Sequence, residues 1–182
     1  MFIFFYRSVE TKSSVHSLGK ELVFAVTRAP NNEITVTFKN RNKSLTLSLE
    51  GFARLCQNLE EITSQLQASL TGDVMFDYHI GSNIAVQINS RFPGVGIQEF
   101  KNIASLPNVK LIPVKESGIF LHPSQWEMFL DLFNTHIIEL LPELSTVHIC
   151  RMGFAHSDLE DDVSCPVCNP NQEYISWLPH WK

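Results

Sequence analysis

Apolar and polar residues alternate strictly over residues 33–39 (EITVTFK), and this pattern predicts a half-buried antiparallel strand. Its apolar face holds Ile34, Val36 and Phe38. Residues 22–27 and 45–47 predict two further strands, and turns rich in Pro, Asn and basic residues separate them. Residues 1–6 (MFIFFY) are apolar but too short for a secretory signal, so we interpret them as an extra strand or an apolar arm.

The apolar period changes from that of a strand to that of a helix after Ser48, which is a good N-cap residue. We therefore predict a helix that runs to Leu70 and ends at Thr71-Gly72-Asp73. Its apolar stripe consists of Leu49, Phe52, Leu55, Cys56, Leu59, Ile62, Leu66 and Leu70.

The second half of the chain repeats this order. Strands are predicted at 75–80, 83–89, 109–114 and 118–121, and 95–100 is a further strand or a bulged edge. A helix is predicted over 123–141, because Pro123 suits the first helical position and Pro142 stops the helix. Its apolar face consists of Trp126, Phe129, Leu130, Phe133, Ile137, Leu140 and Leu141.

The two halves also match in sequence. Residues 44–52 align with residues 118–126, and in each a strand leads directly into a helix whose first turn carries an aromatic residue, Phe52 or Trp126. One sheet-and-helix layer of about 50 residues is a poor core by itself, whereas two could bury their helices against each other. The predicted fold class is α+β: two antiparallel sheet-plus-helix units (1–71 and 72–145) packed as an intramolecular pseudo-dimer, and a small tail (146–182).

The segment Gly118-Ile119-Phe120-Leu121, followed by Gln125-Trp126 and an amphipathic helix, resembles the Whirly-like positive cofactor four family of transcriptional coactivators. In that family a curved four-stranded antiparallel sheet precedes one helix, two such units pair through their helices, and single-stranded DNA binds the concave sheet faces. The resemblance covers residues 78–141, and residues 18–70 look like a diverged copy. It implies a non-enzymatic single-stranded DNA-binding protein that acts in transcription or replication in the nucleus.

Single-strand binding needs cations that neutralise the backbone and flat rings on which bases stack. Arg91-Phe92, in a turn before Pro93, is the most suggestive pair. The alternative is that these cations are ordinary solvated charges and that Phe92 is a core residue. The candidate nucleic-acid-binding residues are Lys20, Arg28, Lys39, Arg41 and Lys43 in the first unit and Arg91, Phe92, Lys101, Lys110 and Lys115 in the second.

The charge of the chain does not have the pattern of a strongly basic nucleic-acid binder, because the net charge is −5. The acidity belongs to the second predicted helix and the tail: residues 123–149 contain Glu127, Asp131, Glu139 and Glu143 but no Lys or Arg. A protein-interaction or structural module that keeps the fold without the DNA-binding face is therefore the second hypothesis. A protein partner or a homo-oligomer would suit it.

The tail contains the pattern Cys150-x5-His156-x8-Cys165-x2-Cys168. Two thiolates on one tight turn, joined by a third thiolate and an imidazole, suit a tetrahedral structural Zn²⁺ site. His148 competes with His156 as the fourth ligand. A redox Cys-x-x-Cys and an acidic tail with incidental cysteines are the alternatives, but Pro166 and Asn169-Pro170 favour a knuckle turn.

An enzyme is not predicted, because the sequence has no Gly-rich phosphate loop, nucleophile elbow or paired-His metal motif. No apolar run approaches the length of a membrane span. The absence of a signal sequence leads us to expect an intracellular protein with reduced thiols. Chains that join such a domain to a Cys/His tail look like invertebrate or viral accessory proteins.

Overall fold

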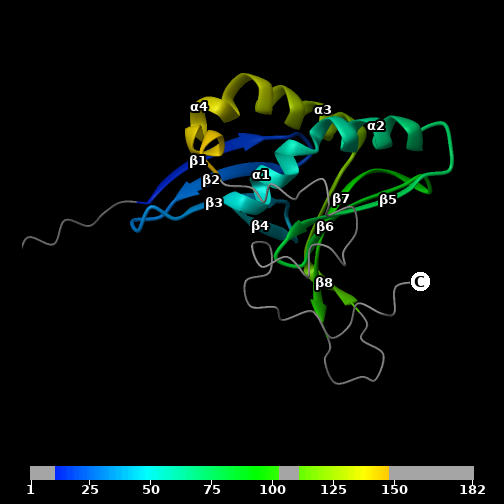
Figure 1. Ribbon diagram of the computed structural model, residues 1–182, viewed down its shortest axis with the longest axis horizontal. Helices are drawn as coiled ribbons and strands as arrows, with labels where there is room; N and C mark the ends of the chain where they lie inside the picture. The colour runs from blue at the N-terminus through cyan, green and yellow to red at the C-terminus, as the bar shows by residue number, and fades with distance from the viewer. Residues whose placement is uncertain (1–10, 103–110, 148–182) are drawn as a thin grey trace, which may run out of the picture.

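The computed structural model describes residues 11–102 and 111–147, and it shows an α+β fold with two four-stranded antiparallel sheets (Figure 1). In each sheet the strands are neighbours in chain order, so every described connection is local. The first sheet contains β1 (Lys12–Ser17), β2 (Val23–Arg28), β3 (Ile34–Lys39) and β4 (Ser44–Ser48). The second contains β5 (Met75–Gly81), β6 (Ile84–Asn89), β7 (Phe92–Asn102) and β8 (Leu111–Leu121). The predicted fold class is confirmed at this level.

A helical segment follows each sheet directly. After β4 come α1 (Leu49–Gln57) and α2 (Leu59–Ser69); after β8 come α3 (Pro123–Leu132), the π-helix η1 (Phe133–Ile137), α4 (Ile138–Leu140) and the 3-10 turn η2 (Pro142–Ser145). Ser48 caps α1 by accepting a hydrogen bond of 3.2 Å from the Gly51 N–H. At the start of α3, the His122 N–H donates to Gln125 Oε1 at 3.1 Å. Both helices thus begin where the sequence predicted.

The helices cross over between the sheets. In Figure 1, α3 and α4 lie above the first sheet, and α2 lies above the second. The ring of Phe129 in α3 lies 5.8 Å from that of Phe24 and 5.6 Å from that of Phe38, both on the first sheet. In return, α1 and α2 pack against strands of the second sheet, and the amide of Asn58 between them donates to Tyr78 Oη at 2.7 Å. Each sheet therefore contacts helices from both halves of the chain, because α1 also packs against β3 and β4, and α3 also packs against β7 and β8.

One apolar core includes the inner faces of both sheets and all the longer helices. Phe129 lies at its aromatic centre, because its ring also contacts Phe52 and Trp126, at 6.4 and 5.4 Å between centroids. Aromatic pairs at these spacings stabilise a core beyond the area that they bury. The first sheet contributes Phe24, Val36 and Leu47, which are fully buried or nearly so.

A bulge in the second sheet joins two segments that the sequence predicted as separate strands. β8 runs from Leu111 to Leu121, and its pairing with β7 jumps from Pro113 to Gly118. The amide of Gln98 fills this irregularity, since its Nε2 donates to the carbonyls of Glu99, Val114 and Ser117 at 2.8–2.9 Å. A Cβ on Gly118 would lie 2.1 Å from Gln98 Oε1, so only glycine fits there without moving this amide.

Candidate nucleic-acid interface

The outer face of the first sheet is rich in hydroxyl groups and poor in charge. Across the sheet, Ser13, Thr27, Thr35 and Ser48 form one row of Cα partners, and Val15, Ala25, Thr37 and Thr46 form the next. Thr37 and Thr46 share a hydrogen bond of 3.1 Å. The third row consists of Ser17, Val23, Lys39 and Ser44. Lys39 is the single cation in the three rows. Thr35 and Thr37 therefore face outward as predicted, but the face itself is nearly neutral.

Four predicted cations gather at one end of this sheet. Lys20 lies in the β1–β2 turn, Arg41 and Lys43 lie in the β3–β4 turn, and Lys39 ends β3. Because Val23 pairs with Lys39 and Lys39 with Ser44, both turns lie at the same end of the sheet. We call Lys20, Lys39, Arg41 and Lys43 the cationic end. It has a net charge of at least +3 after the Arg41–Glu21 ion pair is counted, from four cations and one carboxylate.

The backbone of the β1–β2 turn is left-handed at three consecutive residues, with φ of 75° at Gly19, 40° at Lys20 and 68° at Glu21. Such angles are costly at Lys20 and Glu21, because both have a Cβ. Hydrogen bonds hold the turn closed: the Leu18 N–H donates to Leu22 O at 2.8 Å, and Gln125 Nε2 of α3 donates to Gly19 O at 3.2 Å. The second helical segment therefore fixes the position of Lys20.

Arg28 does not belong to the cationic end. It lies at the opposite end of β2, where its guanidinium contacts both carboxylate oxygens of Glu143 at 2.5 and 2.9 Å and donates to Leu140 O at 3.0 Å. The hydrogen bond from Arg28 lowers the pKa of Glu143, and the same bond raises the pKa of Arg28. Arg28 thus holds the turn after α4 against the first sheet.

The outer face of the second sheet carries exposed apolar side chains. Phe92 is 75% exposed and Met75 is 82% exposed, and Asn89 pairs with both of them in the sheet. Phe120, 41% exposed, lies across β7: a Cβ on Gly94 would be 2.3 Å from its ring. We call the two rings of Phe92 and Phe120, together with the exposed Met75 on the same face, the aromatic ledge. The interpretation of Phe92 as a core residue is therefore wrong.

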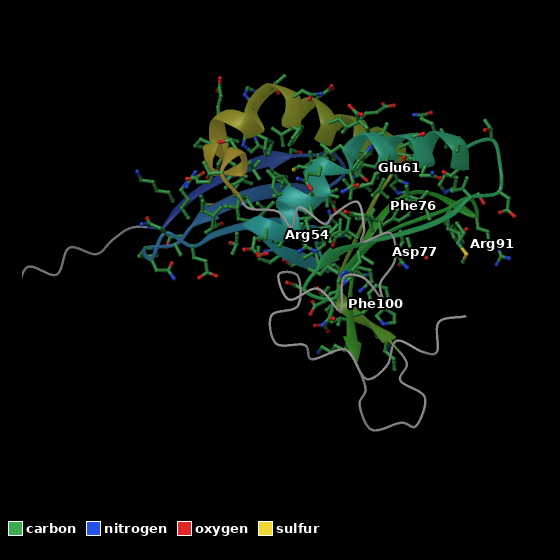
Figure 2. All side chains as sticks on the ribbon, viewed as in Figure 1. Arg54, Glu61, Phe76, Asp77, Arg91 and Phe100 are labelled. Carbon is green, nitrogen blue, oxygen red and sulfur yellow. The ribbon has the colours of Figure 1, made fainter. Side chains whose placement is uncertain are left out.

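The other predicted cations of the second sheet lie at both of its ends. Arg91 is in the β6–β7 turn beside Phe92, and Figure 2 shows it at the outer end of the sheet, far from Phe100. Lys101 is on β7 beyond the bulge at Gln98, and Lys115 is on β8 within the bulge. The acidic residue Asp77 lies on the same face and accepts a hydrogen bond of 2.7 Å from Gln87 Nε2. Lys110 is outside the described residues.

The predicted zinc ligands Cys150, His156, Cys165 and Cys168, and their competitor His148, are outside the described residues as well. Within the described ranges, no group of three or more His, Cys, Asp and Glu side chains could hold a metal ion. Cys56 is partly buried in α1, and burial raises the pKa of its thiol, so it has little thiolate character.

No family model, curated protein or solved structure matches the chain. In the part of the chain that the structure describes, no helix has the length and apolar character needed to cross a membrane.

Sequence reasoning did not place Met75, Phe120 and Gly94 at the site. The signal for Phe120 was present: it alternates with Ile119 and Leu121, which are buried, so it must face outward. The glycines at 94 and 96 were a second signal, because glycine in a strand often marks close approach of another group.

Proposed function

We propose that the protein binds single-stranded nucleic acid, specifically DNA, and that it has no enzymatic activity. The observation that carries this proposal is the aromatic ledge beside Arg91. Phe92 and Phe120 offer exposed rings on the outer face of the second sheet, and stacking on such rings contributes about 1–3 kcal/mol per base without requiring a particular sequence. In this proposal Arg91, in the turn directly before Phe92, neutralises a phosphate next to the stacked bases.

The cationic end of the first sheet supplies a second group of backbone contacts. Three of its four cations lie on two adjacent turns and the fourth, Lys39, ends β3. In this proposal they neutralise neighbouring phosphates of the bound strand. The outer face of the first sheet is nearly neutral and rich in hydroxyl groups. It can donate hydrogen bonds, but it offers no ring for stacking. In this proposal the two sheets contribute unequally: bases bind the second and phosphates bind the end of the first.

The crossed helices support the pseudo-dimer that the family resemblance implies. The Phe129 ring of α3 packs on Phe24 of the first sheet, and α1 and α2 pack on the second sheet as well as on neighbouring elements, as expected if two similar units share their helices. We propose that the two sheet-plus-helix units are such a pair within one chain, followed by a tail stapled by structural Zn²⁺. A role in transcription or replication in the nucleus is part of the same proposal.

A second candidate function is the binding of a protein partner. Met75 and Phe92 are far more exposed than large apolar side chains usually are, and Asp77 on the same face would repel a phosphate backbone. Exposed apolar side chains that cluster on one face are typical of protein interfaces. The cation-poor outer face of the first sheet also suits this alternative.

Fluorescence anisotropy with a labelled oligothymidine separates the two functions. We expect binding at low salt that weakens as salt rises, and Phe92→Ser should weaken it by about 1–3 kcal/mol, which is about 5- to 150-fold in affinity. Val15→Ser is the matched control, because Val15 is 62% exposed on the outer face of the first sheet. Lys20→Gln and Lys43→Gln should each lower the slope of log affinity against log salt by about 0.7. No binding at micromolar protein would contradict the proposal and favour a protein partner.

A further inference from the structure

An apolar groove lies between α1 and the turn that ends the described chain. Its volume is about 580 Å³, which is within the range of pockets that hold small ligands or a few large side chains. Most of the lining residues are apolar, Gln57 and Ser145 are polar, and none is charged. The lining residues are Ala53, Cys56, Gln57, Phe133, Leu141, Pro142, Leu144, Ser145 and Val147.

The apolar side chains of this groove are only partly covered. Cys56, Phe133 and Leu144 pack against the core but remain partly exposed. Phe133 begins the π-helix, a rare form that often marks a functional position. The opposite wall is held in place by the ion pair between Arg28 and Glu143. The groove is therefore built on fixed elements, and its apolar surface would gain from a covering group.

The chain itself leaves the groove at Val147, which lines it and is the last described residue. From there, 182 − 147 = 35 residues remain. The part up to residue 163 is acidic, but residues 174–181 (YISWLPHW) contain no Asp, Glu, Lys or Arg and five large apolar residues: Tyr174, Ile175, Trp177, Leu178 and Trp181. The connection from Val147 to Tyr174 can span tens of ångströms when extended, so it can return to its starting point.

We propose that residues 174–181 of the same chain occupy this groove. The uncharged apolar segment matches an uncharged apolar lining, and tethering gives it a high effective concentration there. Burial of one or two of its aromatic rings removes about 150–250 Å² each from water. The inference does not depend on nucleic-acid binding, and it assigns a role to the end of the tail that a zinc site would not require.

Amide hydrogen exchange on the full-length protein tests the proposal. We expect the amides of residues 174–181 to exchange at least about tenfold more slowly than in an unstructured peptide, because a docked segment is protected. Leu144→Glu puts a charge in the groove and should abolish this protection. Leu70→Glu is the matched control, because Leu70 is 49% exposed at the end of α2 and does not line the groove. Trp177→Ser, which changes the tail alone, should lower the protection while the sheets keep theirs.

Three results would overturn the proposal. Unprotected amides over 174–181 in the unmodified chain would leave the groove to an external partner. Protection that survives Leu144→Glu, with the β-strand amides still protected, would place the tail elsewhere. Protection that appears only at high protein concentration, together with a dimer in light scattering, would show that the tail of a second copy fills the groove.

Discussion

The indole Nε1 of Trp126 donates a hydrogen bond of 2.9 Å to Thr63 Oγ1, and this contact joins α3 to α2. Trp126 is 1% exposed, so its indole N–H has little access to water. The Thr63 hydroxyl in turn donates to Leu59 O at 2.6 Å. Two consecutive hydrogen bonds, from Trp126 to Thr63 and from Thr63 to Leu59, thus link α3 to α2 within the apolar core.

Replacing Thr63 by Val should lower the free energy of unfolding by about 1–3 kcal/mol, because the buried indole N–H loses its acceptor. Trp126→Phe removes the donor, so the double variant should lose less than the sum of the two single variants. Thr46→Val on the exposed outer face is the control and should have little effect. Urea unfolding monitored by circular dichroism measures all four. Additive losses would show that the hydrogen bond does not couple the helices.

Gly94→Ala tests whether the aromatic ledge depends on the glycines of β7. The new Cβ would lie 2.3 Å from the Phe120 ring and 2.7 Å from Leu121 O, so the ring and the strand backbone must both move. We expect a loss of about 1–3 kcal/mol in the free energy of unfolding, as for other overpacked sites. Gly72→Ala is the control, because its nearest atom would be 3.6 Å away. Equal stability of the two variants would refute the close packing of Phe120.

Strand prediction succeeded where one face of a strand is buried and the other is polar. Residues 33–39 and 83–89 were placed within one residue of β3 and β6, because their alternation is strict. β1 was missed, since KSSVHS has a single large apolar residue, Val15, and it faces outward. Its inner face instead presents His16, whose ring stacks on His136 of η1 at 6.4 Å. Pairing with β2, rather than local pattern, makes this segment a strand.

Helix prediction found the helical segments but not their interruptions. The apolar stripe of 49–70 continues through Asn58, yet α1 ends there, because the Asn58 side chain donates to Arg54 O and Tyr78 Oη. Similarly, 123–141 changes to a π-helix at Phe133. The first interruption depends on Tyr78, 20 residues away in the chain, and the period of the apolar residues indicates neither interruption.

The candidate site was predictable in composition but not in arrangement. Arg28 and Lys39 lie in the same hairpin. Arg28 is paired with Glu143, 115 residues later in the chain, whereas Lys39 is exposed at the end of β3. Arg91 and Phe92 were correctly placed in or next to a turn, but the exposure of Phe92 follows from the register of β6 with β7. Charge counts cannot reveal such pairings.

The zinc hypothesis predicts one Zn²⁺ per chain in native mass spectrometry. Cys165→Ser should abolish binding, because it removes one of two thiolates on the knuckle turn. Cys56→Ser is the control and should keep the metal, since Cys56 lies in α1 and its thiol is largely protonated. Parallel substitutions His148→Ala and His156→Ala identify the fourth ligand by which one weakens binding. A metal-free full-length chain, purified without chelator in the presence of zinc, would contradict the hypothesis.

The ion pair of Arg28 with Glu143 should make stability depend on pH in the acidic range. The folded state lowers the pKa of Glu143 below its ordinary value, so the unfolded chain takes up the proton first as pH falls. The stabilisation is therefore fully present above the ordinary carboxyl pKa of about 4.3 and is lost as pH falls through the lowered value. Since both side chains are partly exposed, we expect a loss of only about 1 kcal/mol in Glu143→Gln at pH 7.

Urea unfolding of the original chain and Glu143→Gln at several pH values measures this dependence. The difference in unfolding free energy should be constant from pH 6 to 8, to within about 0.3 kcal/mol, and should shrink as pH falls below the ordinary carboxyl pKa of about 4.3. Glu139→Gln serves as the control, because Glu139 is an exposed carboxylate four residues earlier in the chain and the ion pair of Arg28 is with Glu143. A difference that persists undiminished at pH 3 would mean that Glu143 acts through packing or its uncharged hydrogen bonds. In that case the turn after α4, and with it one wall of the groove, would not depend on the charge of Glu143.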